Sequence, residues 1–472
     1  MANSPHRFDE EFSYSGRWWL PDQEEAEEEE KEKQWIGTVT YKPNLGIELE
    51  LLSGVDVLKP NVGHSLEIVP DKKRFLGRVM GAPYYLTLLD NRGYSASCKW
   101  NSLVRTYRPK YLLVGFDLRS PEDVTEETTL QRVAVTYSSL DGWMRTDSPV
   151  SYSYAFEDEK LSEMSLEVTP GRKISEFEIP AINSNVLFYE GCRSSSGGSK
   201  HEISIHRSIQ INPLSPQTLD WFCEQIDSMR DLLAFLTGLP VESTRIRAGL
   251  EEDISRAGYV DVYRRMRPVD TNEEFNIKMA FPFFLLGNLT PTVFQRWFER
   301  RKILRVPINL CLGVIYREHR NLEFELLVLL QALEGYYQAI HPELNRPSLR
   351  RCLTCLRREI PFELRSKLGI TRNLQKEIIY TRNYYTHYDP EREKDALKVE
   401  ELYEAISKLI LFVVTIIARD LKISKEILFD LHKRISQQEL WLWQRPPLRP
   451  KPLKEESDEG QPEEVETDSP AT

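Results

Sequence analysis

The hydrophobic pattern of this chain changes its period at Pro213, and no other feature constrains the fold as strongly. Before Pro213, apolar residues alternate with polar ones, as in strands with one buried face. Ile203, Ile205 and Ile209 share one face of such a strand. After Pro213, apolar residues recur every three or four positions, which is typical of amphipathic helices. The sequence therefore predicts an α+β multidomain chain, in which a β-rich sandwich or open barrel of short strands precedes an all-α bundle.

Composition divides the 472 residues further. We expect a β-rich domain over 1–212, a connector of mixed structure over 213–305 and an all-α domain over 306–445. The segment 446–472 is rich in proline and acidic residues and is expected to be disordered. The serine and glycine run at 194–199 predicts a flexible loop before the last strand of the β-rich domain.

Helical spacing is clearest in one segment of the connector and in six segments of the all-α domain. Ser215 is the expected N-cap of the earlier helix, with Pro216 at its first position and Gly238 beyond its end. The later helices are expected over 308–317, 322–340, 348–358, 371–387, 394–421 and 424–437.

The formal net charge of −11 argues at first against a nucleic-acid ligand, but two short stretches carry all of it. The segments 22–33, an expected acidic loop, and 451–472 each hold eight acidic residues and two lysines, and together they contribute −12, which leaves +1 elsewhere. Within the remainder, 346–382 holds ten Lys and Arg against three Glu, a local +7. Such a cluster can contact phosphates, although a solvated basic helix pair explains it as well. The RNA-binding candidates in it are Arg350, Arg351, Arg357, Arg358, Arg372 and Lys376.

The cysteine count and the apolar runs bear on the compartment. Six cysteines are too few for a disulfide scaffold, and residues 1–11 contain no apolar core of a signal peptide. A reducing cytoplasm is therefore the expected location. The longest apolar run, 409–418, has about half of the roughly 20 residues needed to span a bilayer, so no membrane helix is expected.

One short segment, RNYYTH at 382–387, carries the strongest sign of chemistry. Pro390 disfavours helical geometry at the residue before it, so His387 is expected at the C-terminal end of a helix that starts near Thr371. Five residues along an ideal helix turn through about 500°, which leaves Arg382 and His387 about 140° apart. A single helix does not present both to one substrate, but two helices around a dimer axis can bring them into one cleft.

The chemistry of this pair suits RNA. A histidine can remove the proton of a 2′-hydroxyl or protonate the leaving 5′-oxygen, and an arginine can stabilise charge on the phosphorane. No metal or other cofactor is required. The alternative interpretation makes Arg382 a surface residue and His387 a helix cap.

These residues resemble a known family. RNYYTH resembles the signature of HEPN ribonuclease domains, in which an arginine and a polar residue precede a histidine, and its helical setting fits their all-α fold. The segment 324–341, with Ala332, Leu333 and Glu334, resembles the preceding helix of the Apea-like HEPN group. Upstream, the β-rich region with LDGW at 140–143 is similar to the N-terminal domain of ApeA-like abortive-infection proteins of bacteria. The resemblance covers residues 12–443.

The resemblance implies that Arg382 and His387 are catalytic and that Asn383 supports the arginine or the RNA. It also implies a homodimer with a composite site, which cleaves host or phage RNA without a metal in antiphage defence by abortive infection. The β-rich domain is then expected to regulate the helical domain and to sense a phage-derived trigger. Glu334 is expected to support the site and is either buried against Arg382 or solvated. In HEPN toxins that a partner nucleotidyltransferase controls, the motif ends His-x-Tyr, whereas Tyr388 directly follows the histidine here.

A non-catalytic HEPN scaffold is the main alternative, in which the basic helices bind RNA or a protein and the Arg/His pair is incidental. Cys352 and Cys355 form a CxxC inside an apolar helix, without a second Cys/His pair at zinc spacing, so no metal site is expected. The chain has no P-loop, GxGxxG, HExxH or GxSxG motif, so nucleotide hydrolysis, hydride transfer and zinc proteolysis lack a basis.

Overall fold

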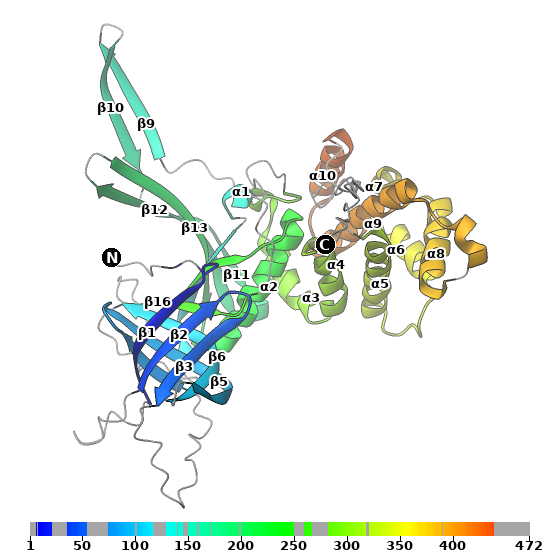
Figure 1. Cartoon of the computed structure of the whole chain (residues 1–472). Coiled ribbons are helices and arrows are strands. Elements are labelled where there is room, and N and C mark those ends of the chain that lie inside the picture. Colours follow the sequence, from blue (N-terminus) through cyan, green and yellow to red (C-terminus); the bar gives the residue numbers. More distant parts are fainter. Residues whose placement is uncertain are drawn as a thin grey trace, which may run out of the picture.

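The computed structural model describes residues 6, 8–20, 35–53, 74–99, 102–116, 129–138, 140–144, 150–157, 160–169, 171–197, 200–249, 259–266, 282–317, 321–388 and 390–438. The two acidic segments predicted at 22–33 and 446–472 lie outside the described residues. Figure 1 shows strands in the N-terminal part of the chain and helices in the C-terminal part. The predicted fold class, a β-rich region followed by a helical bundle, is confirmed.

Six antiparallel strands close into a barrel. They are β1 (Phe12–Trp19), β2 (Trp35–Lys42), β3 (Gly46–Ser53), β4 (Arg74–Val79), β5 (Tyr84–Lys99) and β6 (Ser102–Phe116). The order β6, β3, β2, β1, β4, β5 returns to β6, because β5 pairs with the other edge of β6. Trp18 fills part of the interior, where Gly37 and Gly77 leave it room: a Cβ on Gly77 would lie 2.5 Å from Trp18 Cε3.

The sheet continues beyond the barrel from one half of β6. Its further strands, in spatial order, are β16 (Tyr259–Arg264), β15 (Ser243–Gly249), β8 (Arg132–Tyr137), β13 (Lys200–Pro213), β12 (Ser184–Gly197) and β11 (Arg172–Ile179). β3 pairs with residues 103–107 of β6, and β16 pairs with residues 111–114. β6 therefore belongs to the barrel and to the extended sheet at once, and two strands of the expected connector, β15 and β16, are part of that sheet.

Smaller elements lie outside the large sheet. β9 (Val150–Glu157) pairs with β10 (Lys160–Val168) in a hairpin that projects from the molecule (Figure 1), and β7 (Thr129–Leu130) pairs with β14 (Gln217–Thr218). The short helix α1 (Leu140–Met144) contains the LDGW segment, whose buried Trp143 donates its Nε1–H to Phe284 O at 2.8 Å.

The first long helix, α2 (Leu219–Thr237), is largely buried between the sheet and the C-terminal helices. Its end before Gly238, which adopts a φ of 71°, is confirmed. The predicted N-cap Ser215 is wrong, because Thr218 caps the helix by accepting the N–H of Trp221 at 3.3 Å. The chain stays extended up to Thr218, where β14 pairs with β7.

The C-terminal helices are α3 (Pro291–Arg301), α4 (Arg305–Ile315), α5 (Leu322–Ile340), α6 (Leu349–Glu359), α7 (Phe362–Leu368), α8 (Arg372–His387), α9 (Val399–Asp420) and α10 (Lys425–Gln438). α9 is the longest of them, and it packs against α5 and α7. The predicted bounds of α5 are confirmed in full, and those of α4, α6, α8 and α10 within three residues at either end. The sequence did not predict α3 or α7.

Two further predictions of local structure are wrong. The helix expected from 394 begins only at Val399, because the N–H of Lys398 donates to Glu401 Oε2 at 3.0 Å and caps it there, after a separate 3-10 turn, η7 (Pro390–Asp395). The loop expected at 194–199 is strand up to Gly197, because β12 pairs with β13 residue by residue out to that point. A complete backbone ladder outweighs the weak strand preference of serine and glycine.

Candidate functional site

The predicted motif lies on the last two turns of α8. Thr371 begins this helix by accepting the N–H of Leu374 on its Oγ1 at 3.1 Å. The helix ends after His387, where Tyr388 adopts the left-handed conformation with a φ of 45° and donates its N–H to Tyr384 O at 2.7 Å. The predicted position of His387 at the C-terminal end of the helix is therefore confirmed.

One side of α8 packs against the rest of the helical domain. Ile378 and Gln375 are buried, and so is Thr381. The Oγ1 of Thr381 donates to Glu377 O at 2.8 Å and accepts the N–H of Leu397 at 2.9 Å, which ties α8 to the chain before α9. These bonds fix which residues of the motif face the bundle and which face solvent.

Arg382 and His387 lie in different surroundings. Arg382 is half-buried, and its Nη1 donates to Asn383 Oδ1 at 3.2 Å. His387 is exposed. Since α8 remains helical between them, the expected separation of about 140° around one helix holds. The motif of one chain thus presents its arginine and its histidine to different sides of α8.

Glu334 on α5 lies within electrostatic reach of Arg382. Burial raises the pKa of the half-buried Glu334 above its usual value, and the positive charge of Arg382 opposes that rise. The carboxylate of Glu334 also acts on Cys352 of α6. The pKa of this thiol is raised to about 11, mainly by burial and to a smaller extent by the charge of Glu334. Glu334 therefore lies within electrostatic reach of both α6 and α8, which pack against α5 and against each other. Of the two alternatives for this residue, partial burial near Arg382 is the one found.

The solvent-facing side of α8 carries a row of tyrosines that the sequence analysis did not single out. Tyr380, Tyr384 and Tyr388 are spaced four residues apart, so they share one side of the helix. The ring centroids of Tyr384 and Tyr388 lie 6.2 Å apart. Tyr388 is 75% exposed and Tyr380 43%. His387 lies beside Tyr388, at the C-terminal end of this tyrosine row. The four-residue spacing of the tyrosines was the sequence signal that could have revealed the row.

The predicted RNA-binding cations fall into two groups. Arg357 is half-buried, and its Nε donates to Ile370 O at 2.8 Å. Burial and the charges of Arg365 and Arg372 lower the pKa of Arg357, so these three arginines lie close together where α6, α7 and α8 meet. Arg365, which was not among the candidates, donates to Ile360 O at 2.9 Å. The exposed candidates are Arg350, Arg351, Arg358, Arg372 and Lys376.

The described part of the chain contains no group of His, Cys, Asp and Glu side chains that could hold a metal ion. Cys352 and Cys355 are both free thiols on α6, and Cys352 is buried. Among the described helices, none combines the length and the apolar character needed to cross a bilayer.

Comparison with known families matches nearly the whole of the described chain. The model of ApeA N-terminal domain 1 matches residues 13–297, and that of Apea-like HEPN matches residues 317–427. No curated protein and no solved structure matches the chain. The HEPN match covers α5 to α9, including Glu334 and the motif on α8. This order of domains fits a defence-associated nuclease or a HEPN scaffold. The chain belongs to the ApeA family, with ApeA N-terminal domain 1 followed by an Apea-like HEPN domain.

Proposed function

We propose that the helical domain of this chain is a metal-independent endoribonuclease that cleaves host or phage RNA in abortive-infection defence. The observation that carries the proposal is the arrangement on α8: Arg382 is half-buried within reach of Glu334, and His387 is exposed five residues later. A positioned guanidinium and an accessible imidazole are the groups that transesterification at a 2′-hydroxyl needs.

Each residue has a distinct role in this reaction. His387 takes the proton of the 2′-hydroxyl as the oxygen attacks phosphorus, or returns a proton to the departing 5′-oxygen. Arg382 stabilises the negative charge of the phosphorane, and its link to Asn383 at 3.2 Å limits its freedom. The products are a 2′,3′-cyclic phosphate and a 5′-hydroxyl. Glu334 is a positioning residue, because its carboxylate acts on RNA only through Arg382.

The site requires a homodimer in this proposal. One straight helix directs Arg382 and His387 to different sides, so neither copy alone offers both groups to one phosphate. Two α8 helices related by a two-fold axis can pair the arginine of one copy with the histidine of the other, and they form two equal sites.

The surface of α8 supports single-stranded RNA as the substrate. The tyrosine row can stack on unpaired bases on either side of the scissile phosphate, because every base has a flat face. Lys376 and Arg372 are exposed nearer the start of the same helix and can contact the backbone phosphates.

A non-catalytic scaffold is the second candidate, and the exposure of Arg350, Arg351 and Arg358 on α6 favours it. These cations can hold RNA or an acidic protein without help from the motif. The scaffold proposal predicts that loss of His387 leaves function intact.

The β-rich domain acts as a regulator in either case and receives a phage-derived trigger. We place the reaction in the cytoplasm, which is supported by the free thiols of Cys192, Cys223, Cys311, Cys352 and Cys355.

RNA cleavage by the purified full chain in EDTA tests the proposal. Wild-type protein should cut RNA and not DNA and should leave the two products named above. His387→Ala should lower the rate by about 10²- to 10⁴-fold and Arg382→Ala by about 10²- to 10³-fold, and the double variant should lose little more than the worse single one. His341→Ala, which removes an imidazole outside the motif, is the matched control. Phage protection by a well-folded His387→Ala protein would sink the ribonuclease proposal.

A further inference from the structure

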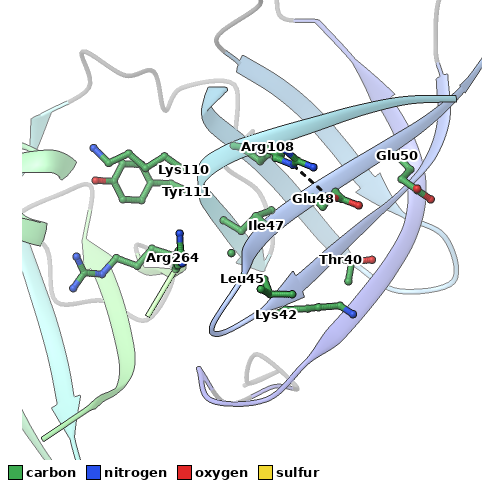
Figure 2. Close-up of a pocket in the computed structure, with 13 residues that line it drawn as sticks. Thr40, Lys42, Leu45, Ile47, Glu48, Glu50, Arg108, Lys110, Tyr111 and Arg264 are labelled. Atoms are coloured by element: carbon green, nitrogen blue, oxygen red, sulfur yellow. Dashed lines mark ion pairs between the residues drawn. The ribbon is translucent and has the colours of Figure 1, made fainter. Parts of the chain in front are cut away.

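A groove opens in the barrel where β6 changes partners. β3 pairs with β6 up to Tyr107 and β16 pairs with it from Tyr111, so among the described strands residues 108–110 pair with neither on that edge. The space left has a volume of about 730 Å³, which lies within the range of small-molecule sites. We call it the barrel groove (Figure 2). It is lined by Thr40, Lys42, Leu45, Gly46, Ile47, Glu48, Glu50, Arg108, Pro109, Lys110, Tyr111, Arg264 and Arg265.

The open side of the groove carries charges of both signs. Lys42, Arg108 and Arg265 are exposed cations, and Glu48 and Glu50 are half-buried. Arg108 meets Glu48 at 3.6 Å, but the side chain of Arg108 is 71% exposed, and such an ion pair is weak enough for another anion to compete with it. Leu45, at the tip of the β2–β3 turn, is largely exposed beside them.

This mixture fits a nucleotide. The guanidinium groups can hold phosphate oxygens, and the two glutamates can accept hydrogen bonds from sugar hydroxyls or a base amino group. The exposed apolar surface of Leu45 can contact the face of a base. A purely cationic groove would favour any polyanion, whereas the two glutamates favour a ligand that also carries donors.

The inner wall of the groove is bonded to α2. Lys110 Nζ meets Asp220 Oδ1 at 2.6 Å, and Tyr111 donates its hydroxyl to the same carboxylate. The two guanidinium nitrogens of Arg264 bind the carboxylate of Asp227, at 3.1 Å from Nη1 to Oδ2 and 2.5 Å from Nη2 to Oδ1. The side chains whose stems line the groove therefore attach by their polar ends to α2.

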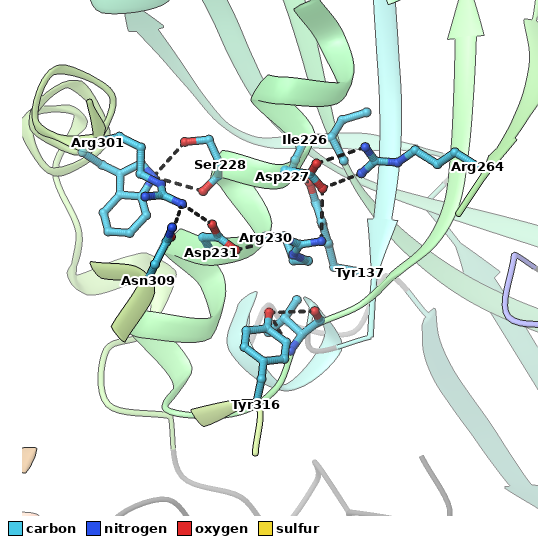
Figure 3. Close-up of polar contacts among 12 residues, drawn as sticks. Tyr137, Ile226, Asp227, Ser228, Arg230, Asp231, Arg264, Arg301, Asn309 and Tyr316 are labelled. Carbon is cyan, nitrogen blue, oxygen red and sulfur yellow. Dashed lines mark hydrogen bonds and ion pairs between the residues drawn. The ribbon is translucent and has the colours of Figure 1, made fainter. Parts of the chain in front are cut away.

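From Asp227 a chain of ion pairs continues into the helical domain (Figure 3). Asp227 meets Arg230 at 3.1 Å, and Arg230 meets Asp231 at 3.1 Å. Asp231 then binds Arg301 of α3 at 2.6 Å. Arg301 also donates to Asn309 of α4 at 2.9 Å. We call Arg264, Asp227, Arg230, Asp231 and Arg301 the α2 ion chain.

The ion chain lies within a packed joint between the domains. Tyr137 of β8 donates its hydroxyl to Ile226 O at 2.9 Å, and Trp297 of α3 donates its Nε1–H to Ser228 O at 3.0 Å. Arg230 and Asp231 are buried, so separating either from its partner would leave an uncompensated charge. A joint of this kind favours discrete arrangements over gradual deformation. α4 in turn packs on α5, which carries Glu334.

We propose that the barrel groove binds a nucleotide and that the α2 ion chain transmits its occupation to the helical domain. The second half rests on the proposed function, because its output is the rate of RNA cleavage. Binding draws on Arg108, Arg265 and Lys42 and moves the groove wall, to which Arg264 belongs. Arg264 holds Asp227, so the shift reaches α3 and α4 through α2.

Binding is measured first, with the full chain and fluorescent mant-ATP and mant-GTP. At least one should bind with a Kd below about 100 μM. Arg108→Ala and Arg265→Ala should each weaken it at least about tenfold. Arg17→Ala, which removes an exposed arginine of β1, is the matched control and should bind like wild type. Failure of both nucleotides to bind would overturn the proposal, as would binding confined to hexaglutamate or to a single-stranded oligonucleotide.

Coupling is measured next, as the change in RNA cleavage rate on addition of the bound nucleotide. Asp227→Asn should keep nucleotide affinity within about twofold and abolish that change. Asp141→Asn, which breaks the ion pair with Arg207 outside the chain, should preserve it. If Asp227→Asn does not fold, Arg301→Gln breaks the α2 ion chain at its other end and serves as the test. Wild-type cleavage that the nucleotide leaves unaltered would refute coupling and leave the proposed function standing.

The same coupling has a readout that does not need cleavage. The nucleotide should alter amide hydrogen exchange in α3 and α4 of the wild type, and not in Asp227→Asn. If the chain cuts no RNA, this exchange decides between a coupled groove and an isolated one.

Discussion

His432 of α10 donates its Nε2–H to Thr415 Oγ1 of α9 across 3.0 Å, and both side chains are buried. The direction follows from Thr415, whose hydroxyl already donates to Leu411 O at 2.7 Å and must accept from the imidazole. Burial, with a smaller contribution from the charge of Lys367, lowers the pKa of His432 to about 4. A neutral imidazole thus joins the two last helices.

This pair predicts a loss of stability in mild acid. The unfolded chain takes up the proton near the ordinary pKa of 6.5 and the folded chain only near 4, so the stability present above 6.5 is lost as the pH falls to about 4. The loss is on the order of 3 kcal/mol. His432→Gln keeps a donor for Thr415 but does not titrate, so its melting temperature should fall less than that of the wild type over this window. If the melting temperatures of the two proteins fall equally as the pH is lowered, the prediction is wrong.

Glu334→Gln should raise stability and lower activity together. Because the folded-state pKa of Glu334 is raised, its favourable contribution is complete below 4.5 and is lost as the pH rises through the folded value. The melting temperature of the variant should therefore equal that of the wild type in acid and exceed it near neutral pH. Its cleavage rate should fall, since Arg382 loses the carboxylate that positions it. Glu224→Gln, an exposed change on α2, should alter neither quantity; a Glu334→Gln protein with full activity would rule out the positioning role.

Mixing two inactive variants should restore cleavage. A dimer of one Arg382→Ala copy and one His387→Ala copy contains one intact composite site and one doubly damaged site. Random exchange makes about half of the dimers mixed, so about a quarter of the wild-type activity should return after the subunits are mixed. Arg382→Ala mixed with the double variant should recover nothing. If the first mixture also stays inactive, the arginine and histidine of one copy act together and the composite site is wrong.

The tyrosine row should contribute to RNA affinity through its rings. Tyr384→Ala should raise KM by about 5- to 150-fold at nearly constant kcat, the equivalent of one stacked base. Tyr384→Phe retains the ring and should behave like the wild type. Light scattering on both variants separates this role from a structural one: conversion of Tyr384→Ala to a monomer would show that the row joins the two copies instead.

The sequence predicts the local elements of this fold better than their arrangement. Alternation marks β3 and β8, and helical spacing marks α5, because each pattern reflects burial of one face of one element. No local pattern reveals that β16 pairs with β6 across the intervening strands and α2, or that α2 is capped by Thr218 instead of Ser215. Those outcomes depend on partners distant in sequence.

The candidate site divides in the same way. Pro390 was enough to place His387 at the end of α8, because the restriction it imposes is local. The engagement of Arg357 with Ile370 O could not be predicted, since that carbonyl is presented by the turn between two later helices. Glu334 remained ambiguous for a related reason: its distance from Arg382 depends on how α5 packs against α8.

Because β6 belongs to both the barrel and the extended sheet, the order of synthesis decides which of its pairings can form first. β6 leaves the ribosome with the other barrel strands, but β16, which pairs with the same edge of β6 as β3, is translated only after α2. Domains generally fold as units during synthesis, N-terminal first. In ribosome-bound chains that are halted after β16 has emerged, the barrel should therefore already resist cleavage by protease. The helix that carries the motif, α8, is translated after all the described strands, so a nascent chain contains the proposed regulator before it contains the proposed site of RNA cleavage.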